Sequence, residues 1–375
     1  MDAAGRVASV SITALFRVDA SLPIGSGHVM RCLTLAEALR DRGVECLFAS
    51  RLQGGHLCDL VRNRGFAALE MPGPAEGRLV STLTGNHAHW LGVTVQQDAE
   101  ETLALLRGRQ IDWLVVDHYS LDATWERALR PACKRIMVID DLADRPHDCD
   151  LLLDQNLGRA VSDYDGLVPC SCDTLIGPKY ALLRPEFARL RSASLARKRL
   201  GHCRHILVTM GGVDMDNVTC DVLAGLETSG FDGDVRVTVV MGAAAPWIDQ
   251  VKRKAERMRL RTSVLVNASN MAELMCEADL AIGAAGSTSW ERCCMGMPTI
   301  QVVLAENQTG IASALEAFGA AISLSREKVR FEVNSAVVNL LRDSNMVAKI
   351  SSLAARIVDG KGVGRVATLL AKAAA

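Results

Sequence analysis

The sequence predicts an α/β protein with two Rossmann-like domains that face each other across a cleft. Strand and helix patterns alternate along most of the chain, which is typical of parallel sheets. The alternation pauses between Gly158 and Arg184, where periodic apolar residues are few, and then resumes. A chain of 375 residues is also long for one core. We therefore expect an N-terminal domain over residues 1–184 and a C-terminal domain over residues 185–375 with a helical tail.

In the first half, short apolar runs typical of buried strands alternate with helical spacing of apolar residues. The predicted strands are 12–18, 44–50, 65–71, 112–117, 135–140 and 151–154. The predicted helices are 29–39, 54–64, 98–107 and a fourth that runs from an N-cap at Asp122 to Leu129. Residues 72–89 are rich in Gly, Pro and polar residues, which indicates a loop.

The second half repeats this pattern after a charged helical segment that runs to Arg199. The predicted strands are 206–210, 235–240, 264–266, 280–282, 298–303 and 321–324. The predicted helices are 216–228, 246–258, 271–277, one from the 283–288 turn to Met295, and 307–318. Residues 327–375 are expected to be helical.

The composition indicates an ordinary globular protein whose partner is a small molecule. The chain is 49% apolar and 23% charged, and its formal net charge is −1. Such a charge gives no bulk attraction to nucleic acid or to an acidic membrane. The sequence contains no apolar run of membrane-spanning length, no export signal and no C-x-x-C pair among its 12 cysteines. We therefore expect a cytoplasmic monomer with reduced thiols and no stable membrane insertion.

The stretch Gly25-Ser26-Gly27-His28 joins the first predicted strand to the first predicted helix. Glycines allow backbone conformations and close approaches that a side chain blocks, and a helix start leaves N–H groups free for an anion. Histidine is a side chain that exchanges protons near neutral pH. The turn lacks the third glycine of a dinucleotide fingerprint and the lysine of a P-loop. A tight turn with an unremarkable histidine is therefore the competing interpretation.

A second turn, Gly283-Ala-Ala-Gly286-Ser287-Thr288, also joins a predicted strand to a helix. Backbone N–H groups and hydroxyls at this position suit a pyrophosphate. Glu291 lies one turn further along and can accept hydrogen bonds from a ribose diol. The alternative is a capping arrangement in which Glu291 reaches back to the start of the helix.

Two further pairs follow strands of the same half. Gly211-Gly212 permits close approach of the backbone to a phosphate, and Asn307-Gln308 offers amide donors and acceptors that can read sugar hydroxyls. The alternative is that the Asn307 and Gln308 side chains form an ordinary cap at the start of the next helix.

Other site chemistries are poorly supported. The Asp-x-Asp pairs at 148–150, 214–216 and 232–234 are expected by chance, and His87-x-His89 has no third ligand nearby. We therefore assign no metal and no cofactor. A serine hydrolase is disfavoured because the chain has no G-x-S-x-G elbow.

Taken together, these segments resemble the UDP-2,4-diacetamido-2,4,6-trideoxy-β-L-altropyranose hydrolases, the nucleotide-sugar hydrolases of pseudaminic acid biosynthesis. The likeness covers roughly residues 11 to 325, although the tail beyond it does not align. The matching stretches are Arg17–Ser21, Ile24–Cys32, Asp140-Asp141, Leu153–Asn156, Gly177–Phe187, Thr209–Gly212 and Ala278–Glu291.

The resemblance implies a GT-B architecture, like that of the N-acetylglucosaminyltransferase that makes lipid II, and a role in flagellin glycosylation. It makes His28 the catalytic base. It also implies substrate-binding positions, which we assign as follows: Asp19, Gly25, Gly27 and Arg31 near the base, Gly211, Gly212, Gly286, Ser287 and Thr288 near the phosphates, Val266 and Met271 at the uracil, Glu291 at the ribose, and Asn307 and Gln308 at the sugar.

Three functions are compatible with these residues. The first is metal-independent hydrolysis of a UDP-linked sugar, in which His28 deprotonates water and UDP leaves with inversion. The second is a GT-B glycosyltransferase that uses His28 or Asp19 to activate an acceptor hydroxyl. The third is a non-catalytic nucleotide-sugar sensor, which the Gly-x-Gly-His turn disfavours.

Overall fold

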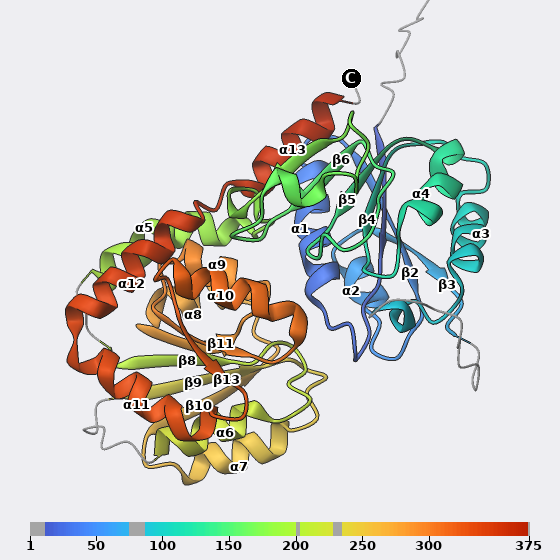
Figure 1. Ribbon diagram of the computed structural model, residues 1–375. Helices are drawn as coiled ribbons and strands as arrows, with labels where there is room; N and C mark the ends of the chain where they lie inside the picture. The colour runs from blue at the N-terminus through green and yellow to red at the C-terminus, as the bar shows by residue number, and fades with distance from the viewer. Residues whose placement is uncertain (1–11, 75–86, 200–202, 228–234, 374–375) are drawn as a thin grey trace, which may run out of the picture. The chain divides into compact units, whose positions relative to one another are not determined.

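A computed structural model describes residues 12–74, 87–199, 203–227 and 235–373 of the protein, which form two compact units (Figure 1). Unit 1 comprises residues 1–153, 164–175 and 364–375, and unit 2 comprises residues 154–163 and 176–363. The segments 154–163 and 176–184, expected in the N-terminal domain, thus belong to unit 2, and the end of the chain belongs to unit 1.

Unit 1 contains a seven-stranded sheet in the order β3-β2-β1-β4-β5-β6-β7. The first six of these are parallel to their neighbours. The strands are β1 (Thr13–Val18), β2 (Glu45–Arg51), β3 (Ala67–Met71), β4 (Ile111–Asp117), β5 (Cys133–Ile139), β6 (Leu151–Asp154) and β7 (Asp173–Ile176). Every residue of β4 is buried, as its continuous apolar run predicts. β7 was not predicted, because its four residues are mostly half-buried or exposed and show no apolar run.

The helices of unit 1 are α1 (Gly27–Arg40), α2 (Cys58–Asn63), α3 (Val95–Leu106), α4 (Ala123–Leu129) and α13 (Gly362–Ala373), which begins at its border with unit 2. Asp122 caps α4 as predicted, since its Oδ1 accepts a hydrogen bond from the N–H of Thr124 at 2.8 Å. The prediction of a helix over 54–64 was too long, because α2 begins only at Cys58. Conversely, α3 begins earlier than predicted, behind an N-cap at Thr94. Part of the predicted 72–89 loop lies outside the described residues.

Unit 2 contains a six-stranded parallel sheet in the order β10-β9-β8-β11-β12-β13. Its strands are β8 (His205–Thr209), β9 (Arg236–Met241), β10 (Arg261–Val266), β11 (Leu280–Ala284), β12 (Thr299–Val303) and β13 (Ile322–Ser325). All six match predicted strands to within a few residues, since each carries its own short apolar run.

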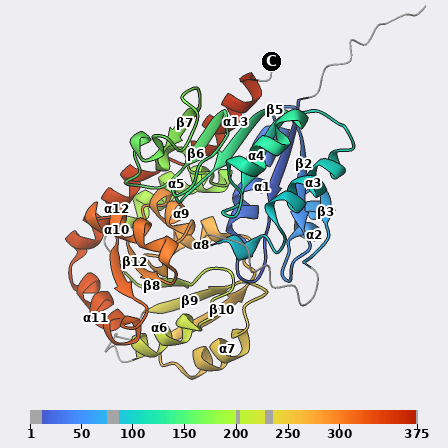
Figure 2. The ribbon, with the colours of Figure 1, turned by 45° about the vertical axis from the view of Figure 1, so that its right-hand side comes forward.

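Helices cover both faces of this second sheet. One apolar core joins Ile206 and Val208 of β8 to α6 (Val218–Glu227), α7 (Ile248–Arg257) and α11 (Val329–Arg342). The other joins Leu207 to α5 (Pro185–Lys198), α8 (Met271–Glu277), α9 (Thr288–Cys294) and α12 (Ser344–Ile357). Alternate residues of one strand thus enter opposite cores. Figure 2 shows α6, α7 and α11 together on one side of the sheet. The remaining helix, α10 (Thr309–Ala317), precedes β13.

The tail is helical, as predicted, and its last helix, α13, packs on unit 1. The indole Nε1 of Trp113 in β4 donates a hydrogen bond to the carbonyl of Leu370 at 3.0 Å. Among the described residues, no helix is long and apolar enough to cross a membrane.

Each sheet reverses its strand order once. In unit 1 the reversal lies between β1 and β4, where Val18 pairs with Asp117, and in unit 2 it lies between β8 and β11. Ligands of such sheets bind outside the carboxyl ends of the strands at this point. The two reversals therefore locate the places to search for a site.

Candidate active site

The first glycine turn has the conformation that its sequence predicts. Gly25 adopts a φ of +77°, which side-chain-bearing residues rarely adopt, and its N–H donates to the carbonyl of Ser21 at 2.8 Å. Helix α1 then begins at Gly27, so His28 lies in its first turn. This places the imidazole at the strand reversal of unit 1.

His28 is paired with a buried carboxylate at the end of β4. Nδ1 of His28 lies 2.6 Å from Oδ1 of Asp117, whose side chain is fully buried. Burial alone would raise the pKa of Asp117, but Arg31 and His28 outweigh this effect and hold the pKa well below its usual range. Asp117 is therefore an ionised carboxylate that only accepts hydrogen bonds, so Nδ1 of His28 must carry the proton.

The proton on Nδ1 determines what the other nitrogen can do. In a neutral imidazole Nε2 then holds the lone pair, and none of the described residues forms a hydrogen bond with it. Arg31 approaches Nδ1 at 3.3 Å, but this is not a hydrogen bond because both nitrogens are donors. The side chain of His28 is 11% exposed. The arrangement leaves one basic nitrogen available to a small molecule.

Arg31 holds the carboxylates around His28. Its Nε and one terminal nitrogen donate to the two oxygens of Asp117 at 2.6 and 2.7 Å, and the other terminal nitrogen lies 2.7 Å from Asp141. Asp141 also accepts a hydrogen bond from the hydroxyl of Tyr119 at 2.7 Å. The Tyr119 ring in turn meets the imidazole of His28 edge-on, with centroids 4.7 Å apart. Arg31, predicted as a substrate-binding residue, is thus buried and bound to protein carboxylates.

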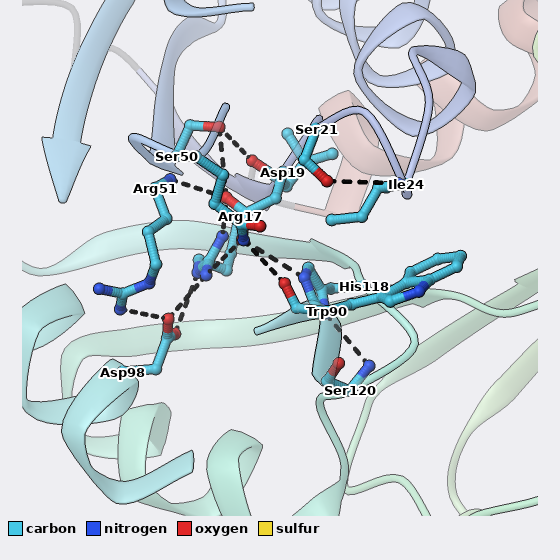
Figure 3. A network of polar contacts seen from close by, with 12 residues as sticks. Arg17, Asp19, Ser21, Ile24, Ser50, Arg51, Trp90, Asp98, His118 and Ser120 are labelled. Atoms are coloured by element: carbon cyan, nitrogen blue, oxygen red, sulfur yellow. Dashed lines mark hydrogen bonds and ion pairs between the residues drawn. The ribbon is translucent and has the colours of Figure 1, made fainter. Parts of the chain in front are cut away.

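A second buried network of charged side chains includes His118, the residue that follows Asp117 (Figure 3). Arg17 donates to Asp19 at 2.7 and 2.9 Å and to Asp98 at 2.7 and 3.0 Å. Arg51 donates to Asp98 at 2.7 Å, and Nε2 of His118 lies 3.3 Å from Asp19. All these side chains are almost fully buried. Asp19 thus faces protein groups on every described contact, which favours a structural role for its side chain over the predicted role in substrate binding.

In unit 2 the predicted Gly211-Gly212 pair and Gly286 lie at the strand reversal. Gly211 and Gly212 follow β8, and Gly211 has a φ of +86°. A Cβ at Gly242, after β9, would lie 2.0 Å from the carbonyl oxygen of Gly212, so the two turns pack backbone to backbone. Gly286 follows β11. The Gly211-Gly212 pair and Gly286 therefore occupy the carboxyl ends of adjacent strands, β8 and β11.

The start of α9 is open. Ser287 is exposed, makes no capping hydrogen bond and precedes Thr288, the first residue of the helix. The capping alternative is therefore not found. Glu291 instead lies with one carboxylate oxygen 3.9 Å from Arg184, and its side chain is 18% exposed. Burial raises the pKa of its carboxyl to about 7, although Arg184 and Arg292 act in the opposite direction.

The remaining predicted residues of unit 2 lie at the same ends of the strands. Val266 ends β10 and is 37% exposed, and Met271 begins α8. Asn307 and Gln308 follow β12 in a short 3₁₀ turn, where Asn307 is exposed. The side chain of Gln308 accepts a hydrogen bond from the N–H of Leu304 at 3.0 Å, and its Nε2 lies 3.8 Å from where a Cβ of Gly286 would be. Gln308 and the Gly286 turn are thus neighbours.

The Asp-x-Asp pairs have structural partners. Asp148 and Asp150 bind Arg130 at 3.1 and 2.6 Å, and Asp214 caps the start of α6 through the N–H groups of Val218 and Thr219. The pair at 232–234 lies outside the described residues. Within the part of the chain that the structure describes, no three His, Cys, Asp or Glu side chains gather as a metal site. All 12 cysteines are free thiols.

Several residues around His28 were not identified from the sequence. Asp117 ends a predicted strand, and His118 and Tyr119 directly follow it, so their position at its carboxyl end was an available signal. Trp90 directly follows the predicted 72–89 loop and carried no such signal. Its ring stacks on that of Tyr119, with centroids 5.4 Å and planes 22° apart.

Comparisons with known proteins agree with this architecture. The model of the glycosyltransferase family 28 C-terminal domain matches residues 205–358. MurG of Acinetobacter baumannii has a similar structure, with a TM-score of 0.68 at 14% identity over 96% of this chain and 99% of that one. CalG4, the calicheamicin glycosyltransferase, has a TM-score of 0.64 at 14% identity over 97% of this chain and 98% of its own. The fold is therefore GT-B, as the sequence predicted.

Curated relatives are also similar in sequence, and two of them bear on the family. The UDP-2,4-diacetamido-2,4,6-trideoxy-β-L-altropyranose hydrolase of Campylobacter jejuni subsp. jejuni serotype O:2 is 25% identical over 73% of this chain and 85% of its own. This similarity confirms the resemblance found in the sequence. The spore coat polysaccharide biosynthesis protein SpsG of Bacillus subtilis (strain 168) is 30% identical over 94% of this chain and 96% of its own. With this identity over almost the whole length of both chains, the protein belongs to the family of the spore coat polysaccharide biosynthesis protein SpsG.

Proposed function

We propose that the protein is an enzyme that hydrolyses a UDP-linked diacetamido-trideoxyhexose at its anomeric carbon. The products are UDP and free 2,4-diacetamido-2,4,6-trideoxy-L-altrose, a precursor for pseudaminic acid. One observation carries the proposal: Asp117 holds the proton of His28 on Nδ1, which leaves Nε2 as a base. The similarity to the Campylobacter jejuni hydrolase supports the choice of reaction and substrate.

In the proposed reaction, Nε2 of His28 removes a proton from a water molecule. The water oxygen bonds to the anomeric carbon, and the bond from this carbon to the diphosphate oxygen breaks with inversion. Asp117 stabilises the imidazolium that forms, since its carboxylate accepts the Nδ1 proton throughout. Arg31 keeps that carboxylate in place from the other side.

Unit 2 is proposed to bind the UDP. The exposed start of α9 at Gly286, Ser287 and Thr288 offers N–H groups and hydroxyls to the diphosphate, with Gly211-Gly212 beside it. These groups stabilise the charge that develops on the leaving group, so the mechanism assigns no step to a metal ion. Glu291 would accept from the ribose diol, the segment from Val266 to Met271 would hold the uracil, and Asn307-Gln308 would contact the sugar.

A glycosyltransferase that uses a UDP-sugar donor is the second candidate. The match to a glycosyltransferase family 28 domain and the likeness to MurG and CalG4 favour it. In that case Nε2 of His28 would deprotonate an acceptor hydroxyl in place of water. Release of UDP from the nucleotide sugar without any acceptor distinguishes the two reactions.

The test is NMR of reaction mixtures that contain the protein and a panel of UDP- and GDP-linked sugars. The proposal expects UDP and the free diacetamido sugar from one substrate, with the first-formed anomer inverted. It expects His28→Ala to abolish turnover while UDP still binds, since the proposed UDP groups lie in the other unit. Full turnover by His28→Ala would refute the assignment of the base. UDP binding without turnover of any sugar would instead favour a sensor.

A further inference from the structure

Trp90 places an aromatic surface next to His28. Its ring centroid lies 6.2 Å from that of the imidazole, and its face stacks on Tyr119 at 5.4 Å. His87 adds a third ring, 4.5 Å from Trp90 and 5.2 Å from Tyr119. The proposed base thus lies at the edge of a cluster of aromatic rings.

Trp90 differs from the core tryptophans of the protein. Trp113, Trp125 and Trp290 are 3%, 0% and 1% exposed, whereas Trp90 and His87 are only half-buried. An indole that served only to fill a core would be buried like these three. Part of the Trp90 ring system therefore remains available to a ligand. Figure 3 shows the indole extending away from Arg51 and Asp98.

The backbone that carries these rings is fixed from two sides. Nε2 of Gln53, after β2, donates to the carbonyl of Trp90 at 2.7 Å. The hydroxyl of Ser120, next to Tyr119, donates to the carbonyl of His87 at 2.6 Å. A ring that is held by its own backbone and supported by Tyr119 loses little conformational entropy when a ligand packs on it. The rings of Trp90, Tyr119 and His87 thus form a preformed aromatic platform.

We propose that Trp90 is a specificity-determining residue whose indole packs against the apolar groups of the sugar. This inference rests on the proposed function, because it takes the bond broken beside His28 to be that of a sugar. A 6-deoxy, twice-acetylated hexose presents three methyl groups that an aromatic face buries favourably. A sugar with a 6-hydroxyl would lose hydration of that group without gaining a partner. Trp90 thus selects deoxy, acylated sugars over ordinary hexosamines.

The test compares Trp90→Ala and Trp90→Phe with a matched control, Phe331→Ala, whose ring on α11 is 79% exposed. KM and kcat for UDP release are measured with the diacetamido-trideoxy substrate and with UDP-N-acetylglucosamine. We expect Trp90→Ala to raise KM for the first substrate about tenfold or more and to reduce the preference between the two substrates by a similar factor. Trp90→Phe should retain most of the preference, and Phe331→Ala should match the wild type. An unchanged preference in Trp90→Ala would overturn the inference.

A second measurement separates this inference from the proposed reaction. Saturation-transfer NMR follows binding of the free 2,4-diacetamido-2,4,6-trideoxyhexose, which requires no turnover. Saturation of its methyl signals by the wild type and by His28→Ala, but not by Trp90→Ala, would support the platform even if no UDP-sugar is hydrolysed. Equal saturation by Trp90→Ala and the wild type would refute the platform even if hydrolysis is confirmed.

Discussion

Nδ1 of His28 lies 2.6 Å from Oδ1 of Asp117, although the two residues are 89 positions apart in the sequence. The contact arises because β1 and β4 are neighbours at the strand reversal, where Val18 pairs with Asp117. Helix α1, which follows β1, can therefore present its first turn to the last residue of β4. One hydrogen bond thereby fixes both the orientation and the tautomer of the imidazole.

Replacing that carboxylate by an amide tests the tautomer. Asp117→Asn can offer either a donor or an acceptor to Nδ1, so the proton is no longer held there, and kcat for UDP release should fall about 10³-fold. Affinity for UDP should stay within about twofold, since the change touches no proposed UDP group. An assay of UDP release measures kcat, and calorimetry measures the affinity for UDP.

The matched control for this variant is Asp112→Asn, because Asp112 lies near the opposite end of the same strand. It accepts hydrogen bonds from the N–H of Thr13 and from Lys134, neither of which belongs to the His28 cluster. It should keep the wild-type kcat. Wild-type turnover by Asp117→Asn would remove Asp117 from the mechanism.

A separate prediction concerns the geometry of the Arg31 guanidinium. Its guanidinium bridges Asp117 and Asp141 with three short contacts, which a single ammonium group cannot reproduce. Arg31→Lys keeps the charge, yet we expect kcat to fall on the order of tenfold and thermal stability to drop. Arg64→Lys, at a more exposed pair with Glu37, should change neither property. Unchanged kcat in Arg31→Lys would show that charge alone suffices.

The sequence predicted the fold because its signals are local. Strands such as β4 and β11 are continuous apolar runs, and turns such as Gly25 require glycine for their positive φ. β7 escaped prediction because a short, partly exposed edge strand has no apolar pattern. The return of α13 to unit 1 depends on a contact between Trp113 and Leu370, 257 residues apart, which no local pattern records.

The site was predicted only in part for the same reason. His28 could be identified because a glycine turn marks the start of its helix. Its partner could not, since the contact with Asp117 depends on the strand order. Asp19 was predicted to bind the substrate, but its carboxylate accepts hydrogen bonds from Arg17. The two oppositely charged residues lie at alternate positions of β1 and its following turn, and their side chains meet below the surface.

The buried network makes a prediction about stability. Burial alone would raise the pKa of Asp19 and of Asp98, but Arg17 and its neighbours lower both values below the usual range. Arg17→Met leaves two buried carboxylates without their main partner, and the free energy of unfolding should fall by about 3–5 kcal/mol at neutral pH. Urea denaturation measures it.

The lowered pKa values also predict how the stability contributed by the Arg17 network changes with pH. Groups with a lowered pKa in the folded state contribute stability above their unfolded pKa and lose it as the pH falls. The wild type should therefore lose stability in acid. The difference in free energy of unfolding between the wild type and Arg17→Met should then become smaller as the pH falls. Arg62→Met, at an exposed pair with Asp59, should leave the free energy of unfolding close to the wild-type value at any pH. An equally small change in Arg17→Met would contradict the role of the network.

Glu291 predicts a pH dependence of UDP binding. Because burial raises its pKa to about 7, the carboxyl is largely protonated in mildly acidic solution. A ribose diol donates more strongly to the ionised form, so binding should favour ionisation and release protons. Affinity should thus rise by up to about tenfold per pH unit below pH 7 and level off above it. The terminal phosphate of UDP also titrates, with a pKa of about 6, so the wild type alone does not isolate this effect.

Glu291→Gln isolates the contribution of Glu291 to the pH dependence of UDP binding, because UDP still titrates while the glutamine side chain does not. Calorimetry in buffers of different ionisation enthalpy should show fewer protons released by Glu291→Gln than by the wild type, and a weaker pH dependence. Glu332→Gln, at an exposed carboxylate on α11, should behave like the wild type. Without ligand, the raised pKa means that Glu291 stabilises the fold below its unfolded pKa of about 4.5 and that this contribution is lost as the pH rises through about 7. Identical proton release by Glu291→Gln and the wild type would show that Glu291 does not contact the ribose.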